Sequence, residues 1–310
     1  MTASSSTPSS RIVIAGGSGF IGSALASHFR ARGHDVVVLT RKARAREDGV
    51  REIAWNGRSF GPWAKELDGA SAVINLTGKS VNCRHTDRTR REIIASRVVS
   101  VRAIADAISA SASPPPVWVQ ASAVGIYGDA GDALCDESAP HGKDFMADVC
   151  EQWEAAFRAA LTPSTRRVVL RFGVVLGHDG GALPTLASLA RWGLGGTVGS
   201  GRQYISWIHL DDLIAIVDRA IDDATITGPY NASNHVPETN AVFMKRLRNA
   251  VHRPWSPPVP AFAVGIGSYI IGTEPSIALH GQRCVPRRLD EVDFAFTHEN
   301  LDETLKGLLS

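Results

Sequence analysis

The chain has 310 residues, of which 44% are hydrophobic and 21% are charged, and its formal net charge is +2. These values are ordinary for a globular protein with one large α/β domain and an appendage, or with two modest domains. A charge so close to zero gives no electrostatic reason to expect a nucleic acid or a membrane as a partner. The expected partner is a small-molecule substrate.

The cysteines, the N-terminal residues and one apolar segment indicate the cellular compartment in which the protein works. The four cysteines stand at positions 83, 135, 150 and 284, without a Cys-x-x-Cys and without metal-ligand spacing. This pattern favours a reducing, cytoplasmic compartment and predicts no metal site. Residues 1–10 are rich in Ser and Thr and predict a disordered tail, not a signal peptide. The apolar segment 261–272 is about half as long as a bilayer crossing needs, so we expect a buried helix or a lid.

The first predicted element is a buried strand at 12–15, which breaks into a glycine-rich run and continues as an amphipathic helix. At such a strand-to-helix turn one glycine makes the tight turn, another lets the backbone approach a pyrophosphate, and a third lets helix and strand pack closely. The helix N-terminus adds free N–H groups and a partial positive charge. The stretch therefore predicts a dinucleotide site formed by Gly16, Gly19, Phe20, Ile21 and Gly22.

A second strand at 35–39 decides which dinucleotide is expected. An acidic residue after this strand would hold the ribose of NAD, whereas an arginine accommodates the extra phosphate of NADP. The chain has Thr40-Arg41-Lys42 there and no acidic residue until Glu47. A solvated basic turn is the alternative. The position favours NADP(H) over NAD(H), with Thr40 and Arg41 in the cofactor site.

Later elements alternate in the same way. The strand predicted at 72–76 runs into Leu76, Thr77 and Gly78, where a small residue and a glycine let a cofactor ribose approach, although a simple turn explains the stretch equally well. A long amphipathic helix follows from Thr86 to Ser109, with Glu92 and Arg97 near the end that faces the cofactor. Further elements are predicted at 51–55 (strand), 62–67 (short helix), 117–120 (strand) and 166–170 (strand).

An ordered set of motifs covers nearly the whole chain from residue 11. These motifs are Gly-Gly-Ser-Gly-Phe-Ile-Gly (16–22), Leu-Thr-Arg (39–41), Asn-Leu-Thr-Gly (75–78), Ser-Ala-Val-Gly-Ile-Tyr-Gly (122–128), Gly-Ser-Gly-Arg-Gln (199–203), Ser-Trp-Ile-His (206–209) and Gly-Gln-Arg-Cys-Val-Pro (281–286). Together they resemble the short-chain dehydrogenase/reductase superfamily in its extended, atypical epimerase-like branch. More narrowly, the chain resembles the uncharacterised NAD-dependent epimerase/dehydratase family of predicted nucleoside-diphosphate-sugar epimerases with an extra C-terminal domain.

The resemblance implies an α/β fold with a doubly wound parallel (Rossmann) sheet, a bound nicotinamide dinucleotide and a small, mainly helical C-terminal cap. We expect a disordered tail at 1–10, an NADP-binding Rossmann domain with substrate loops at 11–233, and a substrate or cap domain at 234–310. The turn after the strand at 166–170 packs against nicotinamide in extended members of the superfamily, which places Val175 in the cofactor site. The glycine-rich run that continues to Gly201 is expected to be a lid or a substrate loop.

The catalytic pattern of the superfamily is incomplete in this chain. Catalytic members pair a Ser or Thr with Tyr-x-x-x-Lys, in which the tyrosine exchanges the proton and the lysine lowers its pKa. Ser122 matches the serine, but none of the four tyrosines has a lysine four residues later. Met146 and Cys150 stand at the two positions instead. Tyr127, the tyrosine nearest in sequence to Ser122, is the candidate for a relocated proton donor; a packing role on a loop is the alternative.

The substrate and the reaction stay open at the level of sequence. Where sugar-nucleotide enzymes carry an arginine for the substrate diphosphate, this chain has Ile205, and Arg202 is a substitute that a solvated loop charge explains equally well. Arg171 opens the expected substrate cleft. The chain is predicted to be an NADP-dependent oxidoreductase or epimerase on a small polar substrate, a sugar nucleotide among the candidates; the alternative is a non-catalytic NADP(H)-binding redox sensor or scaffold. A monomer or a homodimer is expected.

Overall fold

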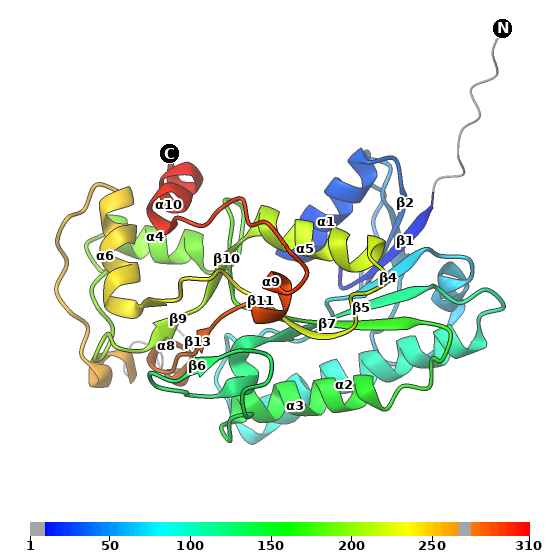
Figure 1. Ribbon diagram of the computed structural model, residues 1–310, viewed down its shortest axis with the longest axis horizontal. Helices are drawn as coiled ribbons and strands as arrows, with labels where there is room; N and C mark the ends of the chain where they lie inside the picture. Colours follow the sequence, from blue (N-terminus) through cyan, green and yellow to red (C-terminus); the bar gives the residue numbers. More distant parts are fainter. Residues whose placement is uncertain (1–9, 266–273) are drawn as a thin grey trace, which may run out of the picture.

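A seven-stranded parallel sheet forms the centre of the computed structural model, which describes residues 10–265 and 274–310 (Figure 1). The strand order is β11-β7-β5-β4-β1-β2-β3, so the chain first builds outward from β1 and then returns to its other side through β4. This reversal beside β1 is the position at which doubly wound sheets bind their ligands. The strands are β1 (Arg11–Ala15), β2 (Asp35–Thr40), β3 (Arg51–Ala54), β4 (Ala72–Asn75), β5 (Val117–Ala123), β7 (Arg166–Phe172) and β11 (Gly228–Ala232).

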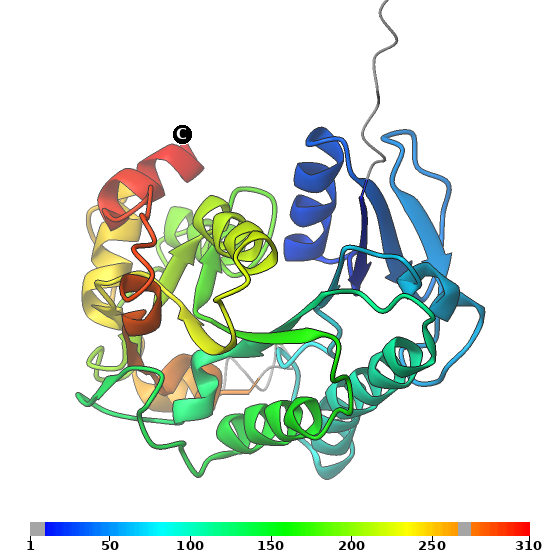
Figure 2. The ribbon, with the colours of Figure 1, turned by 45° about the vertical axis from the view of Figure 1, so that its right-hand side comes forward.

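Helices cover both faces of the sheet, as the two views of the ribbon show (Figures 1 and 2). On one face lie α1 (Phe20–Ala31) and α5 (Leu210–Asp222), and on the other lie α2 (Asp87–Ala110) and α3 (Phe145–Arg158). Alternate residues of β1 enter separate cores, since Ile12 and Ile14 pack with the first pair of helices and Val13 packs with the second. Strands buried on both faces explain the unbroken apolar runs in the sequence.

The predicted elements at the start of the chain are confirmed. The helix expected from Thr86 to Ser109 is α2, and the Thr86 side chain caps it by accepting the Thr89 N–H. The short helix expected at 62–67 is a 3-10 turn, η1 (Pro62–Leu67), that packs in the same core as α2. Another 3-10 turn, η2 (Val124–Tyr127), follows β5 directly.

The glycine-rich run that ends at Gly201, predicted to be a lid or a substrate loop, is partly helical. It contains α4 (Leu183–Arg191), because Leu183, Ala187 and Ala190 form an apolar stripe that is buried against the C-terminal helices. The helices of this third core are α4, α6 (Asn240–Ala250) and α10 (Leu301–Leu309). Two short sheets flank them, formed by β8 (Val174–Leu176) with β10 (Trp207–His209) and by β9 (Tyr204–Ile205) with β12 (Glu238–Thr239).

The C-terminal region is interlaced with the chain that follows β5. Strand β13 (Arg283–Cys284) pairs in parallel with β6 (Leu134–Cys135), and the short helices α8 (Ser276–Leu279) and α9 (Arg287–Asp290) flank β13. Most of the apolar segment expected at 261–272 lies outside the described residues; within its described part Phe262 is 72% exposed. In the part of the chain that the structure describes, no helix combines the length and the apolar character that a membrane crossing requires.

Candidate functional site

The glycine-rich turn after β1 brings the carboxyl ends of three strands together. Gly16 adopts a left-handed φ of +76°, and a Cβ on it would lie 3.1 Å from the backbone of Leu76 and Thr77 beyond β4. Its N–H donates to the Leu39 carbonyl of β2 at 3.0 Å. Only a glycine fits this conformation and this contact without strain, so the sequence fixes the turn where β1, β2 and β4 meet.

The start of α1 is arranged for an anion. A Cβ on Gly22 would lie 2.5 Å from the Gly17 Cα, so helix and turn touch through bare backbone. Gly19 is the N-cap residue of α1 and forms no side-chain cap, which leaves N–H groups of the first helical turn available to a ligand. The Phe20 ring packs against Gly177 and Gly180, in the loop before α4, and Ile21 packs against the core of the sheet.

A basic pocket of about 700 Å³ opens beyond β2, beside the glycine turn. The Thr40 hydroxyl donates to the Ser18 hydroxyl at 3.3 Å and so joins β2 to that turn. Arg46 is held by Asp48 and Glu52. The side chains of the other cations at this pocket, Arg41, Lys42 and Arg44, form no hydrogen bond or ion pair with any described residue. They are therefore available to an anionic ligand. The lining residues are Ser18, Ser23, Thr40, Arg41, Lys42, Arg44, Arg46 and Glu52.

The third edge of the crevice is the turn after β4. The Thr77 hydroxyl is buried and has no hydrogen-bond partner among the described residues. A buried hydroxyl without a partner carries a desolvation cost that a ligand can remove, and Thr77 touches Gly16, so this observation fits a bound nucleotide at the glycine turn. Leu76, the residue before it, packs against both cores of the sheet.

Arg97 and Glu92, which were predicted at the helix end that faces the cofactor, lie near this turn, and each has protein partners. The Arg97 guanidinium donates to the Lys79 carbonyl at 3.0 Å, lies over the Trp153 ring at 4.9 Å and would touch any Cβ on Gly78. Burial lowers the pKa of Arg97. Hydrogen bonds from Lys79 and Arg88 lower the pKa of Glu92 to about 2. Val175 is 8% exposed in β8, behind Phe20, and belongs to the core.

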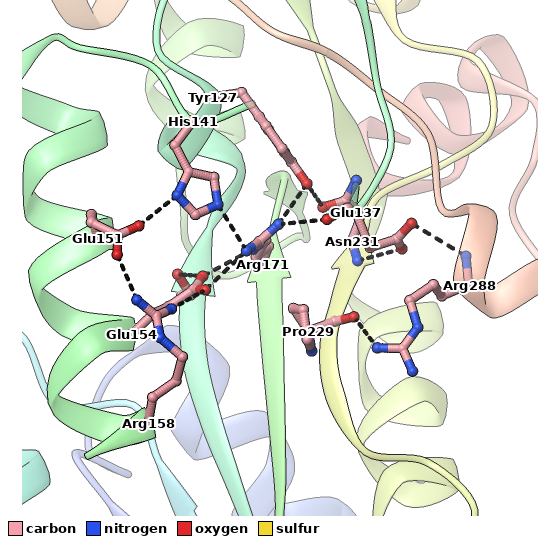
Figure 3. Close-up of polar contacts among 11 residues, drawn as sticks. Tyr127, Glu137, His141, Glu151, Glu154, Arg158, Arg171, Pro229, Asn231 and Arg288 are labelled. Atoms are coloured by element: carbon pink, nitrogen blue, oxygen red, sulfur yellow. Dashed lines mark hydrogen bonds and ion pairs between the residues drawn. The ribbon is translucent and has the colours of Figure 1, made fainter. Parts of the chain in front are cut away.

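A polar network with a buried centre surrounds Arg171, in β7 (Figure 3). At its centre the Arg171 guanidinium of β7 forms a two-pronged ion pair with the Glu154 carboxylate of α3, with both N–O distances at 2.9 Å. The remaining guanidinium N–H groups point to the Tyr127 hydroxyl at 2.9 Å and, at longer range, to His141 and the Glu137 carbonyl. All five donors of the arginine are thus engaged.

The network extends from this pair to the C-terminal region. The Tyr127 hydroxyl donates to the Asn231 side chain of β11 at 2.7 Å, and the Asn231 N–H donates to the Glu137 carboxylate at 2.8 Å. That carboxylate also accepts the Arg288 N–H of α9 at 3.3 Å. Burial raises the pKa of Glu137 above its ordinary value. The chain of contacts therefore runs from the Rossmann sheet into α9.

These contacts correct the assignment of Arg171 to substrate. Its side chain is 3% exposed and its charge is already matched by Glu154, so the guanidinium has no donor left for a ligand. Ser122 is 2% exposed and donates to Glu154 at 2.8 Å. Tyr127 is 3% exposed, its hydroxyl is bonded on both sides, and burial raises its pKa above the ordinary value. In this conformation neither hydroxyl faces a substrate, so the geometry gives no support to their catalytic assignment.

Arg202, unlike the buried Arg171, lies at the molecular surface. Its side chain is 80% exposed and pairs with Asp132 at 3.4 Å, which leaves it accessible at the molecular surface. Cys150 is buried in α3, and burial raises the pKa of its thiol to about 12, as the packing role expected from sequence requires.

Asn231 and Glu137 were not predicted from the sequence. They stand in no recognisable motif and become partners only through the pairing of β11 with β7 and the approach of α9.

His209, Asp211 and His298 form a further cluster, the one group of possible metal ligands in the described residues, with ligand atoms within 4.8 Å of one another. The two imidazoles are stacked, with ring centroids 3.7 Å apart and planes inclined by 25°. Imidazole lone pairs lie in the plane of the ring, and an ion held about 2 Å from both nitrogens of two rings stacked face to face would lie out of both planes, so this geometry does not suit a metal. His209 instead caps α5, which begins at Leu210, because its Nδ1 accepts the Asp211 N–H at 3.1 Å.

Comparisons with known proteins identify the family. Residues 12–233 match the NAD dependent epimerase/dehydratase family, and residues 259–308 match DUF1731, a domain of unknown function. The chain is 34% identical over 301 residues to the epimerase family protein YfhF of Bacillus subtilis, with 96% of this chain and 98% of that protein covered. It is 34% identical over 305 residues to the human epimerase family protein SDR39U1, with 97% and 100% covered.

Solved structures agree with this assignment. The human epimerase family protein SDR39U1 (isoform 2) with NADPH superposes with a TM-score of 0.86 at 33% identity, covering 96% of this chain and 99% of that one. The nucleoside-diphosphate sugar epimerase from Corynebacterium glutamicum gives a TM-score of 0.78 at 31% identity, covering 97% of this chain and 58% of that one. The chain is a member of the NAD-dependent epimerase/dehydratase family, with the Rossmann fold of nicotinamide dinucleotide-binding proteins.

Proposed function

We propose that this protein binds NADP(H) in preference to NAD(H). The observation that carries the proposal is the basic pocket beyond β2, where the 2′-phosphate of NADP would lie in a doubly wound fold. Its cations include Arg41, Lys42 and Arg44, and the acidic residue that would select NAD is absent from the end of β2. The NADPH in the human SDR39U1 structure supports the same preference.

The residues around the crevice are proposed to contact different parts of the cofactor. Gly16 and Gly22 allow the close backbone approach, the first turn of α1 offers N–H groups to the pyrophosphate, and the Thr77 hydroxyl offers a hydrogen bond to the ligand. Arg41 supplies positive charge to the 2′-phosphate. A charge-assisted hydrogen bond of this kind contributes about 1.5–3 kcal/mol, or roughly ten- to hundredfold in Kd.

A titration of the purified protein with the four nicotinamide dinucleotides tests the proposal. NADPH and NADH are followed by nicotinamide fluorescence, and the oxidised forms by competition. Arg41→Glu should weaken NADPH by about tenfold or more and change NADH little. Arg102→Glu, the same charge reversal on the exposed side of α2, is the matched control and should change neither. Equal losses of NADPH and NADH in Arg41→Glu would refute the phosphate-reading role.

We further propose that the protein is an oxidoreductase or epimerase acting on a small polar substrate. Nicotinamide supplies hydride transfer when it is bound. The family membership and the name of the C. glutamicum relative make sugar nucleotides the first substrates to test. Ser122 and Tyr127 are bonded inside the protein in this conformation, so neither hydroxyl is free to transfer a proton to a substrate without giving up its partner. Arg202, at the surface, is the side chain proposed to meet the substrate.

One observation favours a second candidate, a non-catalytic NADP(H)-binding sensor or scaffold. The two hydroxyls expected to transfer a proton are engaged inside the protein instead, since Ser122 donates to Glu154 and Tyr127 donates to Asn231. A screen of UDP-sugars and small carbonyl compounds, followed by nicotinamide absorbance, separates the two candidates. Substrate-dependent turnover that Ser122→Ala leaves unchanged would support an enzyme without this serine as its catalyst. Tight NADPH binding with no turnover on any substrate would favour the sensor.

A further inference from the structure

Two cysteines that are far apart in the sequence face each other across a strand pair. Cys135 ends β6 and Cys284 ends β13, and the parallel pairing sets the two in direct register. Neighbouring strands lie about 4.8 Å apart, and disulfides span Cα separations of about 4.4–6.8 Å. The side chains are 3% and 0% exposed and lie in one apolar cluster with Ile126. Both are free thiols in the structure.

The two thiols also interact chemically. The neighbouring Cys284 thiol lowers the pKa of Cys135, while burial raises the pKa of Cys284. The thiolate is the nucleophilic form of cysteine, so Cys135 is the attacking sulfur and Cys284 is the resolving one. The strand edge beside them is open, because Leu134 is 56% exposed.

We propose that Cys135 and Cys284 form a reversible disulfide when the protein meets a peroxide. The Cys135 thiolate attacks one peroxide oxygen, the O–O bond breaks, and a sulfenic acid and hydroxide result. The Cys284 sulfur then attacks the Cys135 sulfur, the S–O bond breaks, and the thiol proton leaves with the departing oxygen as water. In total, two thiols are oxidised to one disulfide and one hydrogen peroxide is reduced to two waters. The bond fastens β13, and with it the C-terminal region, to the segment after β5.

The other two cysteines lack this arrangement and serve as internal controls. Cys150 belongs to the same apolar cluster but lies in α3 and is not part of the β6–β13 strand pair. Cys83 lies on a loop, where its thiol donates to the Ser80 carbonyl at 3.6 Å. A double variant, Cys83→Ser with Cys150→Ala, therefore keeps the reactive pair and removes both alternatives.

The experiment exposes the full-length protein to hydrogen peroxide, blocks remaining thiols by alkylation and maps peptides by non-reducing mass spectrometry. We expect one cross-linked peptide joining Cys135 to Cys284, present in the double variant, absent in Cys284→Val and reversed by dithiothreitol. A disulfide closing so long a loop should raise Tm by roughly 5–10 °C. In the map of the wild-type protein, oxidation confined to Cys83, or a cross-link that does not join Cys135 to Cys284, would overturn the proposal; this outcome does not depend on how well Cys284→Val folds. An unchanged Tm with the bond formed would overturn the fastening role.

Discussion

The ion pair between Glu154 and Arg171 makes a quantitative prediction about stability. Glu154→Gln keeps the shape of the side chain and removes its charge, which leaves the guanidinium of Arg171 buried without a counter-charge. Both side chains are 3% exposed, and the pair is joined by two contacts of 2.9 Å. Leaving one member of such a pair unmatched costs about 3–5 kcal/mol, a large part of the roughly 5–15 kcal/mol that stabilises a typical domain.

Urea unfolding under reducing conditions measures this loss, and the same helix supplies a matched control. Glu151 lies one turn before Glu154, pairs with His141 and Arg158 at 2.5 Å, and is 41% exposed. Exposed pairs contribute about 0–1 kcal/mol, so Glu151→Gln should lower the free energy of unfolding by no more than that. If Glu154→Gln is no less stable than Glu151→Gln, the central role of the buried pair is refuted.

A double replacement checks the cause of the loss. Glu154→Leu combined with Arg171→Met removes both charges at once, and replacing a whole buried pair by apolar residues is often neutral or stabilising. We expect this variant to be more stable than Glu154→Gln, although Ser122 and Tyr127 lose hydrogen-bond partners. A double variant less stable than Glu154→Gln would show that packing, not charge, dominates the network.

Other features give further predictions. Burial and the neighbouring His298 lower the pKa of His209, so the folded state favours the neutral ring. The resulting stabilisation is complete above the unfolded-state pKa of about 6.5 and is lost as the pH falls through the folded-state pKa. His209→Asn keeps a capping oxygen but does not titrate, so urea unfolding of this variant should be less sensitive to pH over that range. Gly22→Ala places a Cβ against the Gly17 backbone and should cost about 1–3 kcal/mol, with NADPH affinity lost too; retention of both would contradict the close approach. Thr77→Val should leave Tm within a few degrees and weaken NADPH, and unchanged affinity would mean that the hydroxyl does not meet the ligand.

The sequence predicts the Rossmann sheet well because its signals are local. A run such as 12–15 followed by glycines marks a buried strand and its turn within a dozen residues, and the side chain of Thr86 marks the start of α2 by itself. The cofactor crevice follows from the same signals, since parallel strands bring their carboxyl ends to one edge. The glycines at 16 and 22 are required by backbone contacts that any sequence with this turn would have to allow.

The buried network was not predictable in the same way. An arginine at the end of a strand suggests an anion-binding side chain, and only the packing of α3 against β5 brings the carboxylate of Glu154 to Arg171 and Ser122. The partner of Tyr127 is Asn231, which arrives from the far edge of the sheet. Such pairings depend on contacts between distant parts of the chain, and no spacing within one segment records them.

The contact between Glu137 and α9 also limits how the chain can be divided. The two family models at 12–233 and 259–308 suggest separable modules. The Glu137 carboxylate nevertheless binds one N–H from β11 and one from Arg288, and the Ser206 hydroxyl donates to the carbonyl of Gln282 at 2.7 Å. A shortened protein that ended before residue 259 would leave these groups open, and a hinged opening of the C-terminal region would have to break them together. A chimera that joins the N-terminal region of this protein to the C-terminal region of a relative therefore has to exchange the residues on both sides of these contacts.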